Sequence, residues 1–265
     1  MGAMQDKVVL ITGGTSGIGL AAAGAFARAG ASIVLAGRRA ELGERVAQEL
    51  RAAGAAVRFV RADVSLGADV QRLLTTVVET YGRLDAAFNN AATTDGALAF
   101  TADFTEEQFD RTVALNLKSV WLCMQAEVRQ MLSQSPEGGA IVNTASVNGL
   151  GGAAGGSLYS AAKAGVLALT KSAAQEYATR GIRVNALVAG AFRTPMLEHV
   201  FATLASGAPD GVAKVEAQYT ELIPVRRIGH PEEAAEAVVW LCSGAASYVT
   251  GHSMIVDGGM TAATR

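Results

Sequence analysis

The N-terminal part of the chain carries a short apolar run that leads into closely spaced glycines. Lys7–Thr12 reads KVVLIT and is rich in β-branched residues, which is typical of a buried strand. Gly13, Gly17 and Gly19 follow, and an alanine-rich helical pattern then runs to about Ala29. This order is the context of a dinucleotide fingerprint, in which a helix N-terminus offers free N–H groups to a pyrophosphate. The alternative is a glycine-rich turn. We predict cofactor contacts from Gly13, Thr15, Ser16, Gly17, Ile18 and Gly19.

Strand-like and helix-like segments alternate along the rest of the chain. Apolar runs that predict buried strands lie at Ala31–Ala36, Ala56–Arg61, Leu84–Phe88, Ala140–Thr144, Arg183–Val188 and Ser253–Val256. No break rich in proline, serine or charge separates them. The pattern predicts one α/β domain over 1–265, a Rossmann-type doubly wound parallel sheet of about seven strands with helices on both faces.

Composition excludes several classes of partner. The net charge of the 265 residues is −2, and no basic stripe or polybasic run favours nucleic acid or an anionic membrane. Cys123 and Cys242 lie in apolar helical patterns without a second cysteine or metal ligand nearby, so we expect reduced core thiols and no metal site. No signal peptide is visible before Asp6, which predicts a cytoplasmic protein.

The end of the second strand carries two arginines where an acidic residue would indicate NAD. Gly37, Arg38 and Arg39 follow that strand, and no Asp or Glu is present to bind a ribose 2′-hydroxyl. A guanidinium matches a 2′-phosphate in charge and fork geometry. We therefore predict that NADP(H) is preferred over NAD(H). The alternative is that both arginines are solvated turn residues.

Residues with reactive or polar side chains fall at several strand ends, which meet at one edge of a parallel sheet. Asp63 follows the third strand and would accept a hydrogen bond from an adenine amino group, cap the next helix, or both. Ser146 follows the apolar run at Ile141, and Tyr159 and Lys163 lie four apart on the next helix, so they share a face.

A lysine ammonium one turn away should lower the pKa of a tyrosine phenol and make it a general acid or base. The Ser146 hydroxyl would hold a substrate oxygen beside Tyr159. These three side chains suit carbonyl reduction or alcohol oxidation with hydride from a cofactor. The alternative is a core tyrosine at Tyr159 and a solvated lysine at Lys163.

Two further segments carry expectations about the site. A long helix with a capping-box start at Thr105 runs to about Ser133 and contains Asn116, which is either a satisfied core amide or a link in a polar relay. The irregular, partly helical segment 195–222 should form a lid. Leu150 and Met196 are apolar, and with Ser146 and Tyr159 they are the predicted substrate contacts, which favours a neutral or partly apolar ketone or alcohol. Arg193, His199 and Arg226 leave room for one anionic group.

Taken together, these motifs resemble the ordinary single-domain short-chain dehydrogenases/reductases over nearly the whole chain. The matching positions are Thr12-Gly13-x-x-x-Gly17-x-Gly19, Asp63-Val64, Asn89-Asn90-Ala91, Asn116, Ser146, Tyr159-x-x-x-Lys163, Gly190 and Thr194. Two positions differ from the usual pattern, with Ala92 in place of a glycine and Ala189 in place of a proline. The acyl-carrier-protein reductases often carry an arginine where this chain has Gln175, which disfavours an acyl-carrier substrate.

The resemblance also implies roles. Tyr159 would donate the proton during reduction, Lys163 would lower its pKa and bind the nicotinamide ribose, and Ser146 would hold the substrate oxygen. Asn116 would position a water in a relay to Lys163. The family is usually tetrameric or dimeric, so a homotetramer or dimer is expected. The implied cofactor contacts beyond the glycine loop and arginines are Asp63, Val64, Asn89, Ala91, Tyr159, Lys163, Gly190, Phe192 and Thr194.

Three readings compete at this point. The first is an NADP(H)-dependent carbonyl reductase or secondary-alcohol dehydrogenase, with 3-oxoacyl thioesters as one possible substrate class. The second is a non-catalytic nucleotide-binding regulatory protein, since a fold does not fix a function. The third is a methyltransferase, which leaves Ser146, Tyr159 and Lys163 unexplained.

Overall fold

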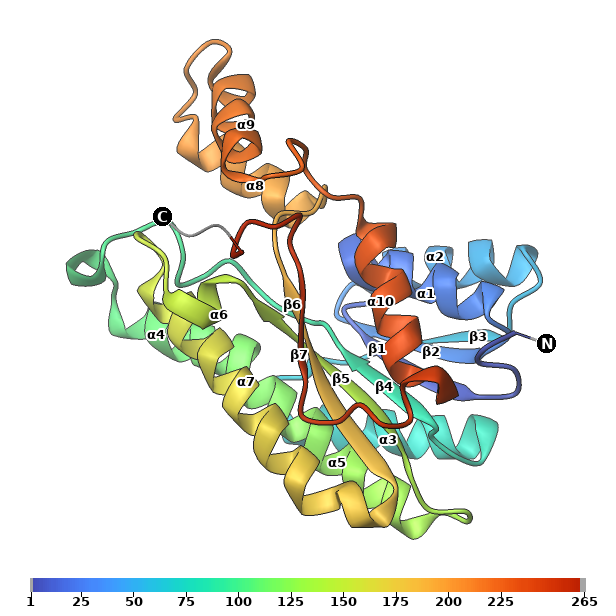
Figure 1. Cartoon of the computed structure of the whole chain (residues 1–265). Coiled ribbons are helices and arrows are strands. Elements are labelled where there is room, and N and C mark those ends of the chain that lie inside the picture. Colours follow the sequence, from blue (N-terminus) through green and yellow to red (C-terminus); the bar gives the residue numbers. More distant parts are fainter. Residues whose placement is uncertain (1, 263–265) are drawn as a thin grey trace.

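The strands of the described residues, 2–262 of a computed structural model, form one parallel sheet (Figure 1). Its order is β3-β2-β1-β4-β5-β6-β7. The predicted α/β class, with a parallel sheet of about seven strands, is confirmed. The strands are β1 (Val8–Thr12), β2 (Ser32–Gly37), β3 (Val57–Arg61), β4 (Ala86–Asn89), β5 (Gly139–Ser146), β6 (Ile182–Ala189) and β7 (Ser253–Val256).

Helices cover both faces of this sheet (Figure 1). On one face lie α1 (Gly17–Arg28), α2 (Ala40–Ala52) and α10 (Pro231–Cys242), and on the other lie α3 (Gly67–Tyr81), α5 (Ser119–Ser133) and α7 (Ser157–Tyr177). The remaining α-helices are α4 (Glu106–Val113), α6 (Asn148–Gly151), α8 (Pro195–Leu204) and α9 (Gly211–Leu222).

The interior strand β1 shows why both faces are covered. Side chains of a strand alternate between faces, so Val9 and Ile11 pack in the core under α1 and α10, while Val8 and Leu10 pack in the core under α3 and α5. All five residues of β1 are buried. An unbroken apolar run is therefore the pattern that a strand between two helical layers requires.

Two elements at the site differ from the sequence-based expectation. The helix predicted from Thr105 to Ser133 is divided by a π-helical turn at Ala114–Lys118 that contains Asn116, although the capping box at its start is confirmed. Strand β5 extends to Ser146, which pairs with Ala189 of β6, so Ser146 is the last strand residue instead of the first loop residue. Small polar residues at the end of β5 hid this extension from an apolar-run criterion.

The segment after β6 is more regular than the irregular lid we expected. It contains α8 and α9, which stand above the carboxyl edge of the sheet (Figure 1). Helix α8 has Pro195 in its first turn, and Thr194 caps it because the Thr194 hydroxyl accepts from Leu197 N at 3.2 Å. Phe201 of α8 and Tyr219 of α9 make an edge-to-face contact with ring centroids 5.0 Å apart, which holds the two helices together.

Two simpler expectations concern the rest of the described chain. Cys123 and Cys242 are both buried free thiols, as predicted. Within residues 2–262, no helix combines the length and apolar character needed to cross a bilayer.

Candidate active site

A cleft of about 600 Å³ opens at the carboxyl ends of the strands. Loops after β1, β2, β3, β4 and β6 line it together with the end of β5 and the start of α7, which is the expected location for a ligand in this fold. We call it the main cleft. The predicted residues that line it are Gly13, Thr15, Ser16, Gly17, Ile18, Arg38, Arg39, Asp63, Val64, Ala91, Ser146, Tyr159, Lys163, Gly190, Phe192, Thr194 and Met196.

Four predicted site residues lie outside the lining of the main cleft. Leu150 is on α6 and exposed, and Asn116 is buried behind the lining. Asn89 is buried within the sheet, where its side chain bonds other core side chains. Gly19 acts through backbone packing, because a Cβ there would lie 2.3 Å from Gly13 O. Ligand contacts of these four residues stay predictions.

The glycine loop leaves room and donors for a phosphate. Gly17 has a φ of +53°, and a Cβ on it would lie 3.0 Å from the Thr194 side chain on the opposite wall of the main cleft. Helix α1 begins at Gly17, and its N-cap Ser16 makes no side-chain capping bond. The first N–H groups of α1 thus remain available at the positive end of the helix dipole, which fits a pyrophosphate.

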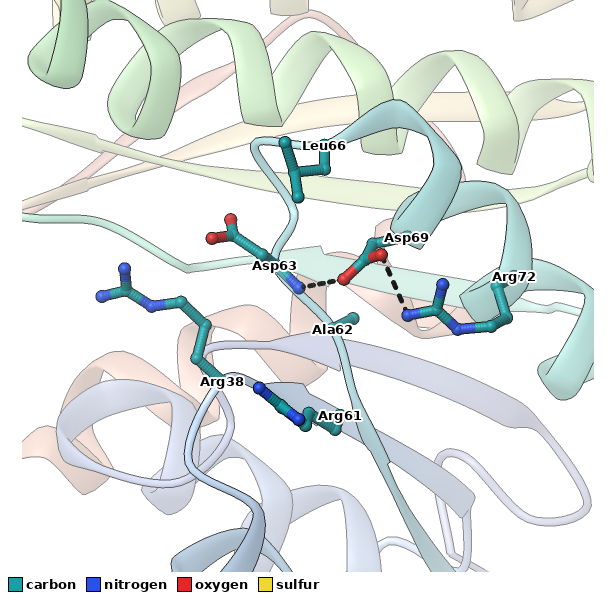
Figure 2. A pocket seen from close by; sticks show the side chains of 7 residues that line it. All are labelled: Arg38, Arg61, Ala62, Asp63, Leu66, Asp69 and Arg72. Carbon is teal, nitrogen blue, oxygen red and sulfur yellow. Dashed lines mark hydrogen bonds and ion pairs between the residues drawn. The ribbon is translucent and has the colours of Figure 1, made fainter.

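A side pocket of about 430 Å³ opens off the main cleft near Arg38 (Figure 2). Its lining is Arg38, Arg61, Ala62, Asp63, Leu66, Asp69 and Arg72. Asp69 pairs with Arg72 at 3.0 Å, whereas Arg38 and Arg61 make no ion pair with any residue in 2–262. Asp63 also lines the pocket, and Arg61 is close enough to help lower the pKa of Asp69, so the three arginines exceed the two aspartates by one positive charge. Arg39 lies on the other side of the loop, where it donates to the Thr15 hydroxyl at 3.4 Å.

Asp63 turns the loop between β3 and α3 and does not cap the helix. Its Oδ1 accepts from the Ser65 backbone at 3.0 Å and from the Ser65 hydroxyl at 2.7 Å, while its own N–H donates to Asp69 at 2.8 Å (Figure 2). The N-cap of α3 is Leu66, which has no side-chain capping bond. The capping alternative is thus wrong, and Asp63 Oδ2 remains as an acceptor at the nucleotide end of the main cleft.

Ser146, Tyr159 and Lys163 come together at the other end of the main cleft. Ser146 ends β5, and its hydroxyl accepts from Asn148 N at 3.2 Å, which orients it. Lys163 is only 1% exposed, and its ammonium donates to the Thr144 carbonyl at 2.8 Å. The same nitrogen lies 5.7 Å from the centroid of the Tyr159 ring. The solvated-lysine alternative is therefore wrong.

The pKa values in this group differ from the simplest expectation. Burial raises the pKa of Tyr159 to about 12, and a hydrogen bond with Ser146 acts in the opposite direction. Burial also lowers the pKa of Lys163 to about 8. We expected Lys163 to lower the pKa of Tyr159, but burial dominates that pKa, and the hydrogen bond with Ser146 is the cause that opposes it. Tyr159 is consequently a neutral phenol at neutral pH, the form that donates a proton.

Asn116 is held by the loop that follows β4. Its Oδ1 accepts from Thr93 N at 3.0 Å, and its Nδ2 donates to Thr93 O at 3.1 Å. These bonds use the amide oxygen and one of the two hydrogens on Nδ2. The second hydrogen remains available as a donor. The π-helical turn around Asn116 is of the kind that often marks functional positions. The relay role stays a prediction.

Thr12, the first residue of the glycine motif, holds the loop after β4, because its hydroxyl accepts from Asn90 N at 3.0 Å and Ala91 N at 3.2 Å.

Several lining residues were not foreseen from the sequence. Val147, Asn148 and the loop 153–156 line the main cleft beside Ser146, and Tyr219 and Met260 reach it from distant parts of the chain. The loop could have been found from its place between Ser146 and Tyr159. No sequence signal marks Tyr219 or Met260.

A nucleotide-binding edge that also carries a serine, a tyrosine and a lysine defines a nicotinamide-dependent oxidoreductase. A family model described as enoyl-(acyl carrier protein) reductase matches residues 13–261. The A-factor type gamma-butyrolactone 1'-reductase (1S-forming) of Streptomyces virginiae is 41% identical over 260 residues, which cover 98% of this chain and 97% of that protein.

Two further relatives agree. Cyclohexanol dehydrogenase of Acinetobacter sp. (strain SE19) is 38% identical over 257 residues, covering 97% of this chain and 96% of that protein. The crystal structure of levodione reductase matches with a TM-score of 0.93 and 39% identity, covering 98% of this chain and 100% of the other. The chain belongs to the short-chain dehydrogenase/reductase family. It is an enzyme that acts on alcohol and carbonyl groups with NAD(P).

Proposed function

We propose that this enzyme transfers hydride between NADP(H) and an uncharged, compact cyclic ketone or secondary alcohol, with Tyr159 as the general acid or base. One observation carries the proposal. Ser146, Tyr159 and Lys163 line the same cleft as the glycine loop of α1, so a nucleotide bound on that loop can extend to them. A regulatory protein would have no need of this arrangement. The test is whether substitution of Ser146, Tyr159 or Lys163 abolishes turnover.

The residues divide the chemistry among them. When bound, the reduced nicotinamide supplies a hydride to the carbonyl carbon. Tyr159 then gives its phenolic proton to the carbonyl oxygen, which becomes the alcohol, and Ser146 holds that oxygen during the transfer. Lys163 lies beside the Tyr159 ring as the nearest buried cation in residues 2–262, and it stabilises the phenolate left behind. In the direction of oxidation the same groups act in reverse.

The preference for NADP(H) is supported by the charge near Arg38. Three arginines and two aspartates line the side pocket, Arg38 makes no ion pair with any residue in 2–262, and no acid directly follows β2 to bind a ribose 2′-hydroxyl. A 2′-phosphate at Arg38 would gain a charge-assisted bond that NAD(H) lacks.

The substitution Arg38→Ala should therefore raise the KM for NADPH by about tenfold to a hundredfold, because a hydrogen bond between charged groups contributes about 1.5–3 kcal/mol. The KM for NADH should stay within about twofold. Steady-state kinetics with both cofactors measure this. Arg45→Ala, which removes an exposed arginine of α2 paired with Glu49, is the matched control. Equal losses for the two cofactors would show that Arg38 is only a surface arginine.

The substrate end of the main cleft favours an uncharged molecule. Its lining there includes Leu98, Met196, Val200 and Tyr219. Arg193 was a candidate for an anionic group, but it pairs with Glu216 and so ties the loop before α8 to α9. The relatives named above include enzymes for a butyrolactone and for cyclohexanol, which supports a compact cyclic substrate. A panel of cyclic ketones, with a 3-oxoacyl thioester for comparison, tests this.

We also propose that the chain forms a homotetramer. Trp121 on α5, Trp240 on α10, and Tyr248 and Ile255 near the free edge of β7 are large exposed apolar side chains. Apolar surface and an uncovered edge strand favour association. Light scattering after size exclusion should give about four times 27.1 kDa, and Trp121→Glu should lower that mass. A monomer at assay concentration would contradict the proposal.

A further inference from the structure

Glu127 is a carboxyl group sealed inside the protein and unused by the mechanism above. It lies on α5 with 0% exposure, under the sheet and away from solvent. Its Oε2 accepts from Asn89 Nδ2 at 2.9 Å, and the same amide donates to Asn143 Oδ1 at 3.1 Å. Asn143 Nδ2 in turn donates to the Thr170 hydroxyl at 3.0 Å. The network joins α5, the ends of β4 and β5, and α7.

Two atoms of this network lack a partner, and they are complementary. Within residues 2–262, Glu127 Oε1 and Asn89 Oδ1 are both buried acceptors without a hydrogen bond. Buried polar atoms in folded proteins rarely stay unpaired, since each costs desolvation energy. Turning the Asn89 amide around would not help, because its oxygen would then face the acceptors Glu127 Oε2 and Asn143 Oδ1. A proton on Oε1 would supply the one donor that is missing.

In the part of the chain that the structure describes, Glu127 has no ion pair with a cation that would favour a carboxylate. The residues that α3 packs into this core are Val70, Leu73, Leu74 and Val77, and β4 and β5 contribute amides. The nearest titratable group is Cys123, one turn earlier on α5, whose pKa burial and the Glu127 charge both raise. Lys163 of α7 is engaged with the Thr144 carbonyl. Within residues 2–262, burial raises the pKa of Glu127, and only the hydrogen bond from Asn89 acts against it.

We propose that Glu127 is a positioning residue: as a neutral carboxylic acid it pairs with both polar atoms of the Asn89 amide and fixes the strand ends that carry the cofactor loop and the Lys163 contact. This acid–amide pair would contain two hydrogen bonds, one from Asn89 Nδ2 to Oε2 and one from Oε1 to Asn89 Oδ1.

The consequences for the site follow from the chain on either side. Asn89 is directly followed by Asn90 and Ala91, whose N–H groups are bound by Thr12 at the floor of the main cleft. Asn143 is directly followed by Thr144, whose carbonyl accepts from Lys163. A loss of the pair should therefore disturb the cofactor loop and the lysine without removing any group that touches a ligand. This role rests on the proposed function only in its effect on turnover.

The protonation state is tested by comparing wild type with E127Q, because glutamine makes the same two bonds at any pH. Burial raises the pKa of Glu127 from 4.5 to about 8. Between these values the unfolded chain has lost the proton and the folded chain keeps it, so wild-type stability falls as pH rises, and above about 8 it changes no further. Lys163 titrates identically in both proteins and cancels.

The melting temperature of E127Q minus that of wild type should thus grow by about 3–5 °C per pH unit from pH 5 to 8 and then level off. E79Q, which removes an exposed carboxylate on α3, should show no such trend. Infrared difference spectra of wild type against E127Q should contain a protonated carboxyl band at pH 6 that disappears above pH 8. A difference in melting temperature that is independent of pH, or a missing band, would overturn the neutral acid.

The positioning role is tested by the dissociation constant for NADPH and by turnover. E127L, which keeps the volume but leaves the Asn89 amide without the acid, should weaken NADPH binding and lower kcat/KM by about tenfold each. E127Q should restore both to within about twofold of wild type. If E127Q is as impaired as E127L, or E127L binds NADPH normally, the role is refuted. If wild type binds NADPH but reduces no carbonyl compound, the proposed function fails, while the binding and melting results still decide the role of Glu127.

Discussion

Tyr159→Phe is expected to lower kcat/KM for carbonyl reduction by about 10²–10⁴-fold, because it removes the group that gives the proton to the substrate oxygen. The loss should fall on kcat, since the hydroxyl acts on the reacting oxygen and contributes less to binding. Affinity for NADPH, measured by fluorescence titration, should remain close to that of wild type. The ring remains in place beneath Lys163, which preserves the packing of α7 against β5.

The structure offers a close control for this substitution. Tyr219 also lines the main cleft, from the lid helix α9, and its pKa is likewise raised by burial. Tyr219→Phe removes a phenolic hydroxyl from the same cleft but should leave kcat within about threefold of wild type, since it is not paired with Ser146. Equal activity of Tyr159→Phe and wild type would end the proposed mechanism.

Lys163→Met is expected to lower activity while it raises stability. Turnover should fall by about 100-fold or more, because the phenolate of Tyr159 would lose its stabilising cation and the Thr144 carbonyl its donor. In the folded protein the pKa of Lys163 is lowered from 10.5 to about 8 by burial. At pH 7 the ammonium is therefore held in the folded state at a cost of about 3 kcal/mol. The substitution removes this cost but also loses a hydrogen bond worth about 1 kcal/mol. The free energy of unfolding of the variant should therefore be about 2 kcal/mol higher than that of wild type.

The gain should also depend on pH in a defined direction. Below about pH 8 both folded and unfolded wild type carry the proton, so the full cost is present. Between about 8 and 10.5 only the unfolded chain keeps it, and the wild type recovers stability until the difference disappears. Urea unfolding of both proteins at pH 7, 9 and 10.5 measures this. Lys171→Met, an exposed lysine on the same helix, is the control and should change neither activity nor stability appreciably. A destabilised Lys163→Met at pH 7 would contradict the argument.

The elements that could be predicted from the sequence are those in which one physical effect dominates. Lys7–Thr12 predicted β1 almost residue for residue, because a strand buried on both faces must be apolar throughout. The glycine loop predicted the start of α1 for a similar reason. A Cβ on Gly17 would crowd Thr194, and a Cβ on Gly19 would collide with the Gly13 carbonyl. The pairing of Tyr159 with Lys163 followed from helix geometry alone.

The misses occurred where tertiary contacts decide. The Asn89 side chain turns inward to Glu127, and no local pattern reveals which way a strand-end side chain points; its cofactor contact stays a prediction. The pKa of Tyr159 depends on how much water the fold removes, which sequence spacing does not measure. The π-helical turn at Asn116 likewise depends on contacts with Thr93, distant in the chain.

The placement of α8 and α9 has a consequence for how such an enzyme diversifies. Helices α8 and α9 are inserted between β6 and α10. Phe201 of α8 contacts Tyr219 of α9, and Arg193 in the loop before α8 pairs with Glu216 of α9. Ser146, by contrast, lies on β5, and Tyr159 and Lys163 lie on α7. Mutations in the inserted unit can therefore change which substrates enter the main cleft without disturbing Ser146, Tyr159 and Lys163. Selection for new substrates can therefore proceed in one short stretch of the gene while the chemistry is inherited unchanged.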